Sequence, residues 1–72
     1  MNTIWESTLD DIFECKVLRT GDRTGQLTVK ENITGQILLD KPVALSYGAQ
    51  FGPDMDDVAQ WQGMCVDVVD NR

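Results

Sequence analysis

Hydrophobic and polar residues alternate along much of this chain, and the alternation predicts β-strands. The clearest case is a strand in which Phe13, Cys15 and Val17 share one side while Glu14 and Lys16 occupy the other. A turn-forming stretch, TGDRTG at residues 20–25, follows this strand. The next alternating segment is 26–30, with its apolar residues again two apart. The two segments are therefore predicted to form a β-hairpin.

Further strand segments follow a second predicted turn at residues 32–35. Residues 36–39 are predicted as a third strand, and Asp40, Lys41 and Pro42 as a break or bend in it. Proline has no N–H to donate to a ladder, so we expect Pro42 at a strand start, an edge or a bulge. Residues 43–47 are predicted to continue as a strand.

The first dozen residues allow two interpretations. Trp5, Ser7 and Leu9 alternate with polar neighbours, and Asp10 with Asp11 would make a two-residue turn, so the segment fits a strand. Trp5 and Leu9 also have helical spacing, and Ser7 with Asp10 resembles a capping box, which leaves a helix as the alternative. We favour the strand because the strong strand after it needs a partner nearby.

The stretch YGAQFGPDMDDVAQWQ, residues 47–62, predicts a loop that leads into a helix from Pro53 to Gln62. Pro53 fixes φ near the helical value. Asp54, Asp56 and Asp57 fall where a helix N-terminus has unpaired N–H groups and a partial positive charge. Capping alone therefore explains much of this acidic cluster, and a binding surface is the competing interpretation.

The predicted helix is short and is followed by a predicted last strand. The residues that recur along it at spacings of three and four are Met55, Val58, Ala59 and Gln62, with Trp61 beside them. Gly63 is expected to end the helix as a left-handed cap. Residues 64–69 are rich in β-branched side chains and predict a strand. A helix of about ten residues does not persist alone, so it must lie on the sheet.

These elements predict an α+β fold in a single domain over residues 1–72. The expected architecture is a small antiparallel sheet of four to five strands, with one short helix at about 53–62 before a C-terminal strand. A small SH3-like or OB-like β-barrel is the alternative. A chain of 72 residues buries only a modest core, so a homodimer would help its stability.

The charge is negative and uneven. The net charge is −6, and residues 42–72 carry five acids and one base. Nucleic-acid binding needs a positive surface, so direct binding to DNA or RNA is not expected. The bases near the first hairpin are interspersed with acids, and we interpret them as solvated edge charges. A protein partner with a basic patch would instead be drawn to the C-terminal part.

The residues that most catalytic and metal sites need are missing or wrongly spaced. The sequence has no histidine, the usual general base and metal ligand. Cys15 and Cys65 lack the spacing of a zinc site. The aspartates from Asp54 onward do not continue as a calcium loop, because Cys65 stands where its last acid belongs. We therefore expect no enzyme activity, no cofactor and no metal.

The N-terminus has no pattern of a signal peptide, and no segment is apolar for the ~20 residues that a membrane span needs. A cytoplasmic location is expected, with no membrane attachment. There Cys15 and Cys65 stay reduced and act as small buried hydrophobic residues.

The leading functional hypothesis is a small acidic, non-enzymatic protein-interaction module, in its most concrete form an inhibitor or immunity-type protein. Trp61 lies between Gln60 and Gln62, which suggests that its ring is only half covered. The candidate partner-binding residues are Asp54, Asp56, Asp57, Trp61, Phe51, Tyr47, Asp67 and Asp70. The alternative is a structural or assembly subunit that buries its apolar strand edges and Trp61 in a homo-oligomer.

Overall fold

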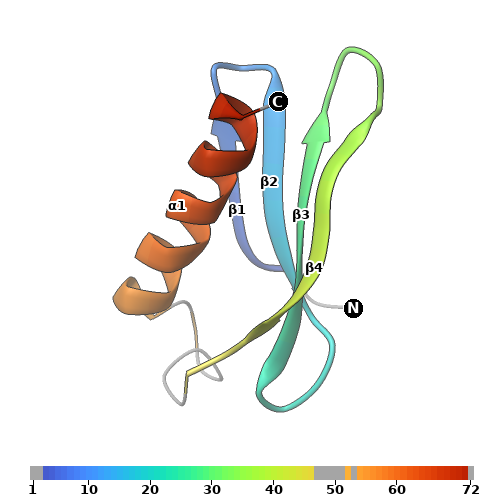
Figure 1. Cartoon of the computed structure of the whole chain (residues 1–72). Helices are drawn as coiled ribbons and strands as arrows, with labels where there is room; N and C mark the ends of the chain where they lie inside the picture. Colours follow the sequence, from blue (N-terminus) through green and yellow to red (C-terminus); the bar gives the residue numbers. More distant parts are fainter. Residues whose placement is uncertain (1–2, 47–51, 53, 72) are drawn as a thin grey trace.

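In the computed structural model, which describes residues 3–46, 52 and 54–71, four β-strands are followed by one α-helix (Figure 1). The elements are β1 (Thr3–Leu9), β2 (Phe13–Arg19), β3 (Thr24–Glu31), β4 (Ile37–Ala44) and α1 (Met55–Asp70). All neighbouring strands are antiparallel, in the order β1-β2-β3-β4. The predicted α+β class is therefore confirmed, and the sheet is open rather than closed into a barrel.

The first dozen residues form a strand and a tight turn. Asp10 and Asp11 have φ values of 54° and 57°, the sign that a type I′ turn requires at both central positions. The pairing of Leu9 with Phe13 adds Ile12 to the predicted two-residue loop. The Ile12 N–H donates to the Leu9 carbonyl at 3.0 Å and closes the turn. The strand interpretation is confirmed, and the helical alternative is wrong.

The β2–β3 hairpin supplies the centre of the core. Cys15 pairs with Val29, and Val17 pairs with Leu27, so their side chains lie on the same face of the sheet. These four residues and Phe13 are at most 1% exposed. The predicted hairpin is thus confirmed. The Asn32–Gly35 turn is confirmed too, and Gly35 takes a φ of +75° there.

Strand β4 runs unbroken through Pro42, so of the predicted break or bend the break is wrong. The Leu45 N–H donates to the Arg23 carbonyl at 2.9 Å, which shows that odd-numbered residues of this segment point their N–H groups toward β3. Backbone groups alternate sides along a strand, so the Pro42 nitrogen faces the free edge of the sheet. Proline costs no ladder bond there. Of the predicted positions for Pro42, the edge is the correct one.

Helix α1 continues well beyond the predicted end. It spans 16 residues, passes through Gly63 and includes the segment that was predicted as a last strand. This segment is helical because the helix packs Cys65 and Val69 against the core, while Val68 lines a hollow with Ile37. Packing of an apolar helix face outweighs the weak local preferences of valine and glycine.

Of the residues that recur along the predicted helix at spacings of three and four, only Val58 packs against the core. Met55, Ala59 and Gln62 are exposed, and the buried positions of the helix are Asp57, Trp61 and Cys65, at a spacing of four. Trp61 is the largest fully buried side chain. Its bulk fixes the rotation of the helix, because burying an indole contributes more apolar area than burying methionine or alanine.

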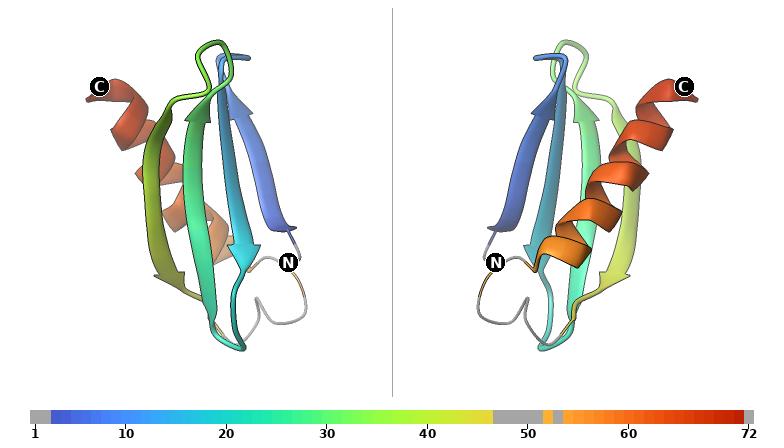
Figure 2. Two further views of the ribbon diagram at one scale, coloured as in Figure 1. Left: turned by 90° about the vertical axis from the view of Figure 1, so that its right-hand side faces the viewer. Right: turned by 90° about the vertical axis from the view of Figure 1, so that its left-hand side faces the viewer.

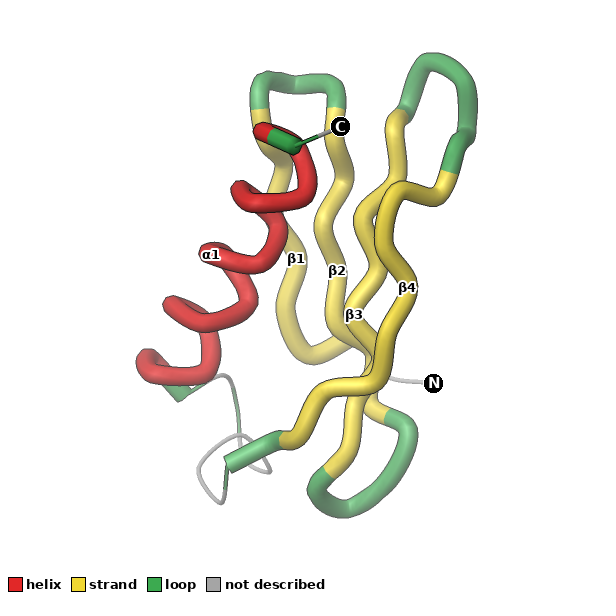
Figure 3. Tube along the Cα trace, viewed as in Figure 1, coloured by secondary structure: helices red, strands yellow, loops and turns green. Residues whose placement is uncertain are grey.

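The helix and the sheet make two layers. Figure 2 shows α1 against one face of the sheet, and Figure 3 shows the same arrangement as a trace. Residues at the C-terminal end of α1 lie beside the beginning of β4, where Val68 and Asn71 line a hollow with Ile37 and Leu38. The core lies between the layers, and the opposite face of the sheet is left open by the described residues.

Gly63 lowers the stability of the helix it lies in. A Cβ at this position would meet nothing within 4 Å. Gly63→Ala should therefore raise the free energy of unfolding by about 1 kcal/mol, the difference in helix propensity, as measured by chemical denaturation.

Gly25→Ala is the matched control. A Cβ at Gly25 would lie 3.0 Å from the Leu18 carbonyl oxygen and 3.1 Å from Val17 Cγ1, so this variant should be destabilised. A helix that ends before Gly63 would gain nothing from Gly63→Ala, and that result would contradict the observed helix.

Candidate functional site

Two aspartates at the N-terminus of α1 accept different backbone hydrogen bonds. Asp54 is the N-cap, and its carboxylate accepts a hydrogen bond from the Asp56 N–H at 2.9 Å. Asp57 Oδ2 accepts a hydrogen bond from the Ser46 N–H at 2.9 Å. Asp57 is only 8% exposed, so it ties the segment after β4 to the first turn of the helix. Both contacts stabilise the fold.

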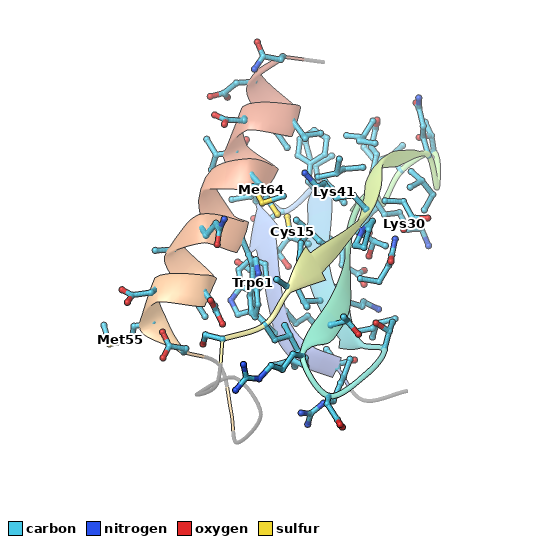
Figure 4. All side chains as sticks on the ribbon, turned by 60° about the horizontal axis from the view of Figure 1, so that its bottom comes forward. Cys15, Lys30, Lys41, Met55, Trp61 and Met64 are labelled. Carbon is cyan, nitrogen blue, oxygen red and sulfur yellow. The ribbon has the colours of Figure 1, made fainter. Side chains whose placement is uncertain are left out.

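Trp61 lies in the core and not on the surface. Its side chain is 1% exposed, so the expectation of a half-covered ring is wrong. The Trp5 ring lies 5.9 Å from the Trp61 ring, between centroids, with the planes tilted by 48°. Figure 4 shows Trp61 between the helix and the sheet, on the side where Cys15 lies. Its polar sequence neighbours point away, since α1 places residues four apart on one face.

Three of the candidate aspartates remain on the solvent side of α1. At about 100° per residue, Asp56, Asp67 and Asp70 fall within roughly 60° of one another around the helix axis, on the side away from Trp61. Exposed Ala59 and Gly63 lie between them along the same line. We call this surface the acidic ridge; its residues are Asp56, Ala59, Gly63, Asp67 and Asp70.

The eight predicted partner-binding residues are thus separated by the fold. Asp56, Asp67 and Asp70 share the acidic ridge, and Asp54 lies half-buried at its beginning. Asp57 and Trp61 are buried. Tyr47 and Phe51 lie outside the described residues, as does Pro53, which was predicted to start the helix.

Two apolar side chains beside the ridge were not among the predicted site residues. Met55 is 87% exposed and Val66 is 37% exposed. Figure 4 shows Met55 directed away from the body of the protein. Both lie on the flank of the helix that also carries Ala59. Met55 and Val66 are eleven residues apart, about three helical turns, which places them on the same side of a continuous helix. The helix was predicted to end before Val66, so this relation was missed.

Shallow hollows border the helix on the β4 side. One, of about 220 Å³, is lined by residues that include Val43, Trp61 and Met64. A wider one, of about 490 Å³, lies where Ile37 meets Val68. No residue of the acidic ridge lines either of these two hollows.

The two cysteines face each other inside the core. Cys15 comes from β2 and Cys65 from α1, both are free thiols, and each is at most 1% exposed. Burial raises the pKa of the Cys65 thiol to about 12, and the hydrogen bond with Cys15 adds to the rise. Burial also raises the pKa of Cys15. Such thiols are poor nucleophiles and metal ligands, because both reactions need the thiolate.

The described part of the chain contains no group of three or more histidine, cysteine or acidic side chains that could hold a metal ion. Within the same residues, no helix has the length and apolar character that crossing a membrane demands. No protein-family model, no curated protein and no solved structure matches this chain. The properties of the surface are therefore the basis for a functional proposal.

Asp57→Ala should lower the free energy of unfolding by about 1.5–3 kcal/mol, the usual contribution of a hydrogen bond to a charged group. The reason is that the Ser46 N–H loses its acceptor. Asp57→Asn keeps an oxygen that can accept this hydrogen bond, so its free energy of unfolding should fall by less. Urea denaturation of the three proteins measures their free energies of unfolding. An Asp57→Ala variant as stable as the wild type would contradict a stabilising hydrogen bond between Asp57 and Ser46.

The Cys65 pKa predicts alkaline destabilisation. The unfolded thiol ionises near 9.0, while the folded thiol keeps its proton until about 12. Below pH 9 the thiol is protonated in both states, and the protein has its full free energy of unfolding. Between pH 9 and 12 the unfolded thiol ionises while the folded thiol does not, so the free energy of unfolding falls.

Unfolding free energies at pH 8 and pH 10.5 measure this loss, with Cys65→Ala as the comparison. The wild type should lose more stability between the two pH values than the variant. Equal losses would show that Cys65 does not titrate abnormally.

Proposed function

We propose that this protein is a small, non-enzymatic interaction module whose acidic ridge binds a basic surface of another protein. The most concrete form of the proposal is an inhibitor or immunity-type protein that covers a basic surface used elsewhere for nucleic acid. We place it in the cytoplasm, where Cys15 and Cys65 stay reduced.

The observation that carries the proposal is the position of Asp67 and Asp70. Both are exposed in the last turns of α1, where no basic residue accompanies them. The C-terminus of a helix carries a partial negative charge, so an acid there costs the helix about 0.3–1 kcal/mol. Asp54 and Asp57 are explained by their hydrogen bonds within the fold, but folding does not account for Asp67 and Asp70.

The charge of the whole segment supports the same partner chemistry. Residues 54–71 contain five aspartates and no lysine or arginine. A surface of one sign attracts the opposite sign and speeds encounter with it, and it repels the phosphates of nucleic acid. The exposed apolar side chains of Met55 and Val66 lie next to the ridge. On binding they would add buried apolar area, which contributes affinity beyond that of the charges.

A pair of charge-reversal variants tests the proposal. The ridge variant carries Asp56→Lys with Asp67→Lys, and the control carries Asp22→Lys with Asp40→Lys, both exposed positions outside α1, of which Asp40 accepts a hydrogen bond from Gln26. The two variants change the net charge equally. In the ridge variant the effects of the helix dipole nearly cancel, because Asp56 lies at the favourable end and Asp67 at the unfavourable one.

Pull-down from a lysate of the native host compares both variants with the wild type, after circular dichroism has shown that each is folded. The partner should be lost with the ridge variant, retained by the control, and released from the wild type as salt rises from 50 to 300 mM. Retention by the ridge variant, or equal loss with both variants, would contradict the proposal.

A further inference from the structure

The two edges of the sheet differ in how well they are protected against pairing with another strand. An edge strand presents unpaired N–H and C=O groups, and proteins block it with proline, inward-pointing charge or bulges. β4 has Pro42 with its nitrogen outward, Lys41 on the helix-facing side opposite Leu27, and a register shift beside Val29. β1 contains neither proline nor lysine, and its register shift lies at its beginning, between Thr3 and Trp5. From Trp5 to Leu9 this edge is regular.

The backbone groups on the free edge of β1 can be assigned. The Leu9 carbonyl accepts from Ile12 in the turn to β2, so the odd-numbered residues of β1 face β2. The N–H and C=O groups of Glu6 and Thr8 therefore face the free edge, because backbone groups alternate along a strand. Among the described residues, no strand pairs with β1 on that side. This edge thus has two donors and two acceptors available to a further strand.

The side chains of β1 on the helix side are only partly covered. Trp5 packs on Trp61, yet Trp5 and Leu9 are half-buried, unlike the fully buried residues of β2 and β3. In Figure 2, β1 lies at the margin of the sheet, away from the C-terminal half of α1. A strand added next to β1 would therefore meet apolar side chains on this face as well as hydrogen-bonding groups at the edge.

We propose that a second copy of this chain pairs with the free edge of β1, antiparallel and centred on Ser7, to make a continuous eight-stranded sheet. In this register Glu6 is opposite Thr8 of the second copy, and the two residues exchange backbone hydrogen bonds. Trp5 is opposite Leu9 of the second copy on the helix side. Cross-strand pairs of an aromatic with an aliphatic side chain are among the stabilising ones.

The competing registers are worse. A pairing centred on Glu6 places two glutamates directly opposite each other, which destabilises a sheet. A shift by one residue would set Glu6 opposite Ser7 of the second copy, whose backbone groups face its own β2 and are not available. In the register centred on Ser7, each Glu6 has its own Lys16 as the neighbour on β2. Of the two pairings compared, only the one centred on Ser7 avoids placing Glu6 opposite Glu6.

The proposed strand pairing determines how the two copies are oriented relative to each other. A two-fold axis that relates antiparallel edge strands runs perpendicular to the sheet, so both α1 helices lie on the same face. Each acidic ridge remains exposed. The dimer does not depend on the proposed binding of a basic partner, and either proposal can fail without the other.

Thr8→Pro tests the edge, because it removes a donor that faces outward and leaves the bonds to β2 in place. Thr8→Val keeps the N–H and is the control. Sedimentation equilibrium from micromolar to millimolar protein should give a concentration-dependent dimer for the wild type and Thr8→Val, and a monomer for Thr8→Pro. A wild type that stays monomeric at millimolar concentration, or a Thr8→Pro variant that dimerises equally, would overturn the proposal.

Disulfide cross-linking tests the register without altering the backbone. Glu6→Cys and Thr8→Cys are mixed in equal amounts under glutathione disulfide, whose reduction to glutathione accompanies formation of the protein disulfide. Opposed residues of a hydrogen-bonded pair have Cα atoms about 5.5 Å apart, within reach of a disulfide. The mixed dimer should exceed either like dimer several-fold. A predominance of the Glu6→Cys like dimer, or a random mixture, would overturn the register.

Discussion

The burial of Trp61 is the interaction on which the rest of this structure depends. Trp61 is in the middle of α1, and its side chain is 1% exposed. Its indole packs in the core cluster with side chains of β2 and β3. A buried aromatic side chain removes some 150–250 Å² from water, a large part of what a small core can offer. Because Trp61 faces inward, Asp57 and Cys65, one turn before and after it, face inward too. The acidic ridge then has to face solvent.

The strands could be predicted from the sequence because their signals are local. Alternation marked β2 and β3, and two consecutive aspartates marked the turn before β2, whose positive φ values aspartate tolerates. The course of β4 could not be predicted, since the harm done by Pro42 depends on whether its nitrogen faces a neighbouring strand. That is a property of the sheet order, which periodicity does not contain.

The helix was harder to predict, because its length and rotation are decided by the sheet. Gly63 and the valines after it favour an end to the helix and a strand, and only the spacing of Asp57, Trp61 and Cys65 favours continuation. The candidate site inherited this error: Met55 was grouped with Val58 and Ala59 by spacing alone, and Val66 was assigned to a strand. Asp57 was assigned to the surface cluster, because its bond to Ser46 joins residues eleven positions apart.

Among the described residues, one helix covers one face of a four-stranded sheet and leaves uncovered the outer side of α1, the other face of the sheet and the sheet edges. The outer side of α1 carries acids at both ends, and those at its C-terminal end weaken the helix. The β1 edge carries backbone groups that no described strand pairs with, next to half-buried Trp5 and Leu9. The edge at β4, by contrast, is blocked by Pro42 and Lys41. The fold therefore separates a charged surface from a strand edge suited to a second copy.

The most direct test of this account is the backbone and aromatic NMR of residues 62–70 and of the two tryptophans. The account predicts helical chemical shifts, sequential amide–amide contacts through Gly63 to Asp70, and contacts between the rings of Trp5 and Trp61. Extended shifts for residues 64–69, with cross-strand contacts to another segment and a solvent-exposed Trp61 ring, would contradict it.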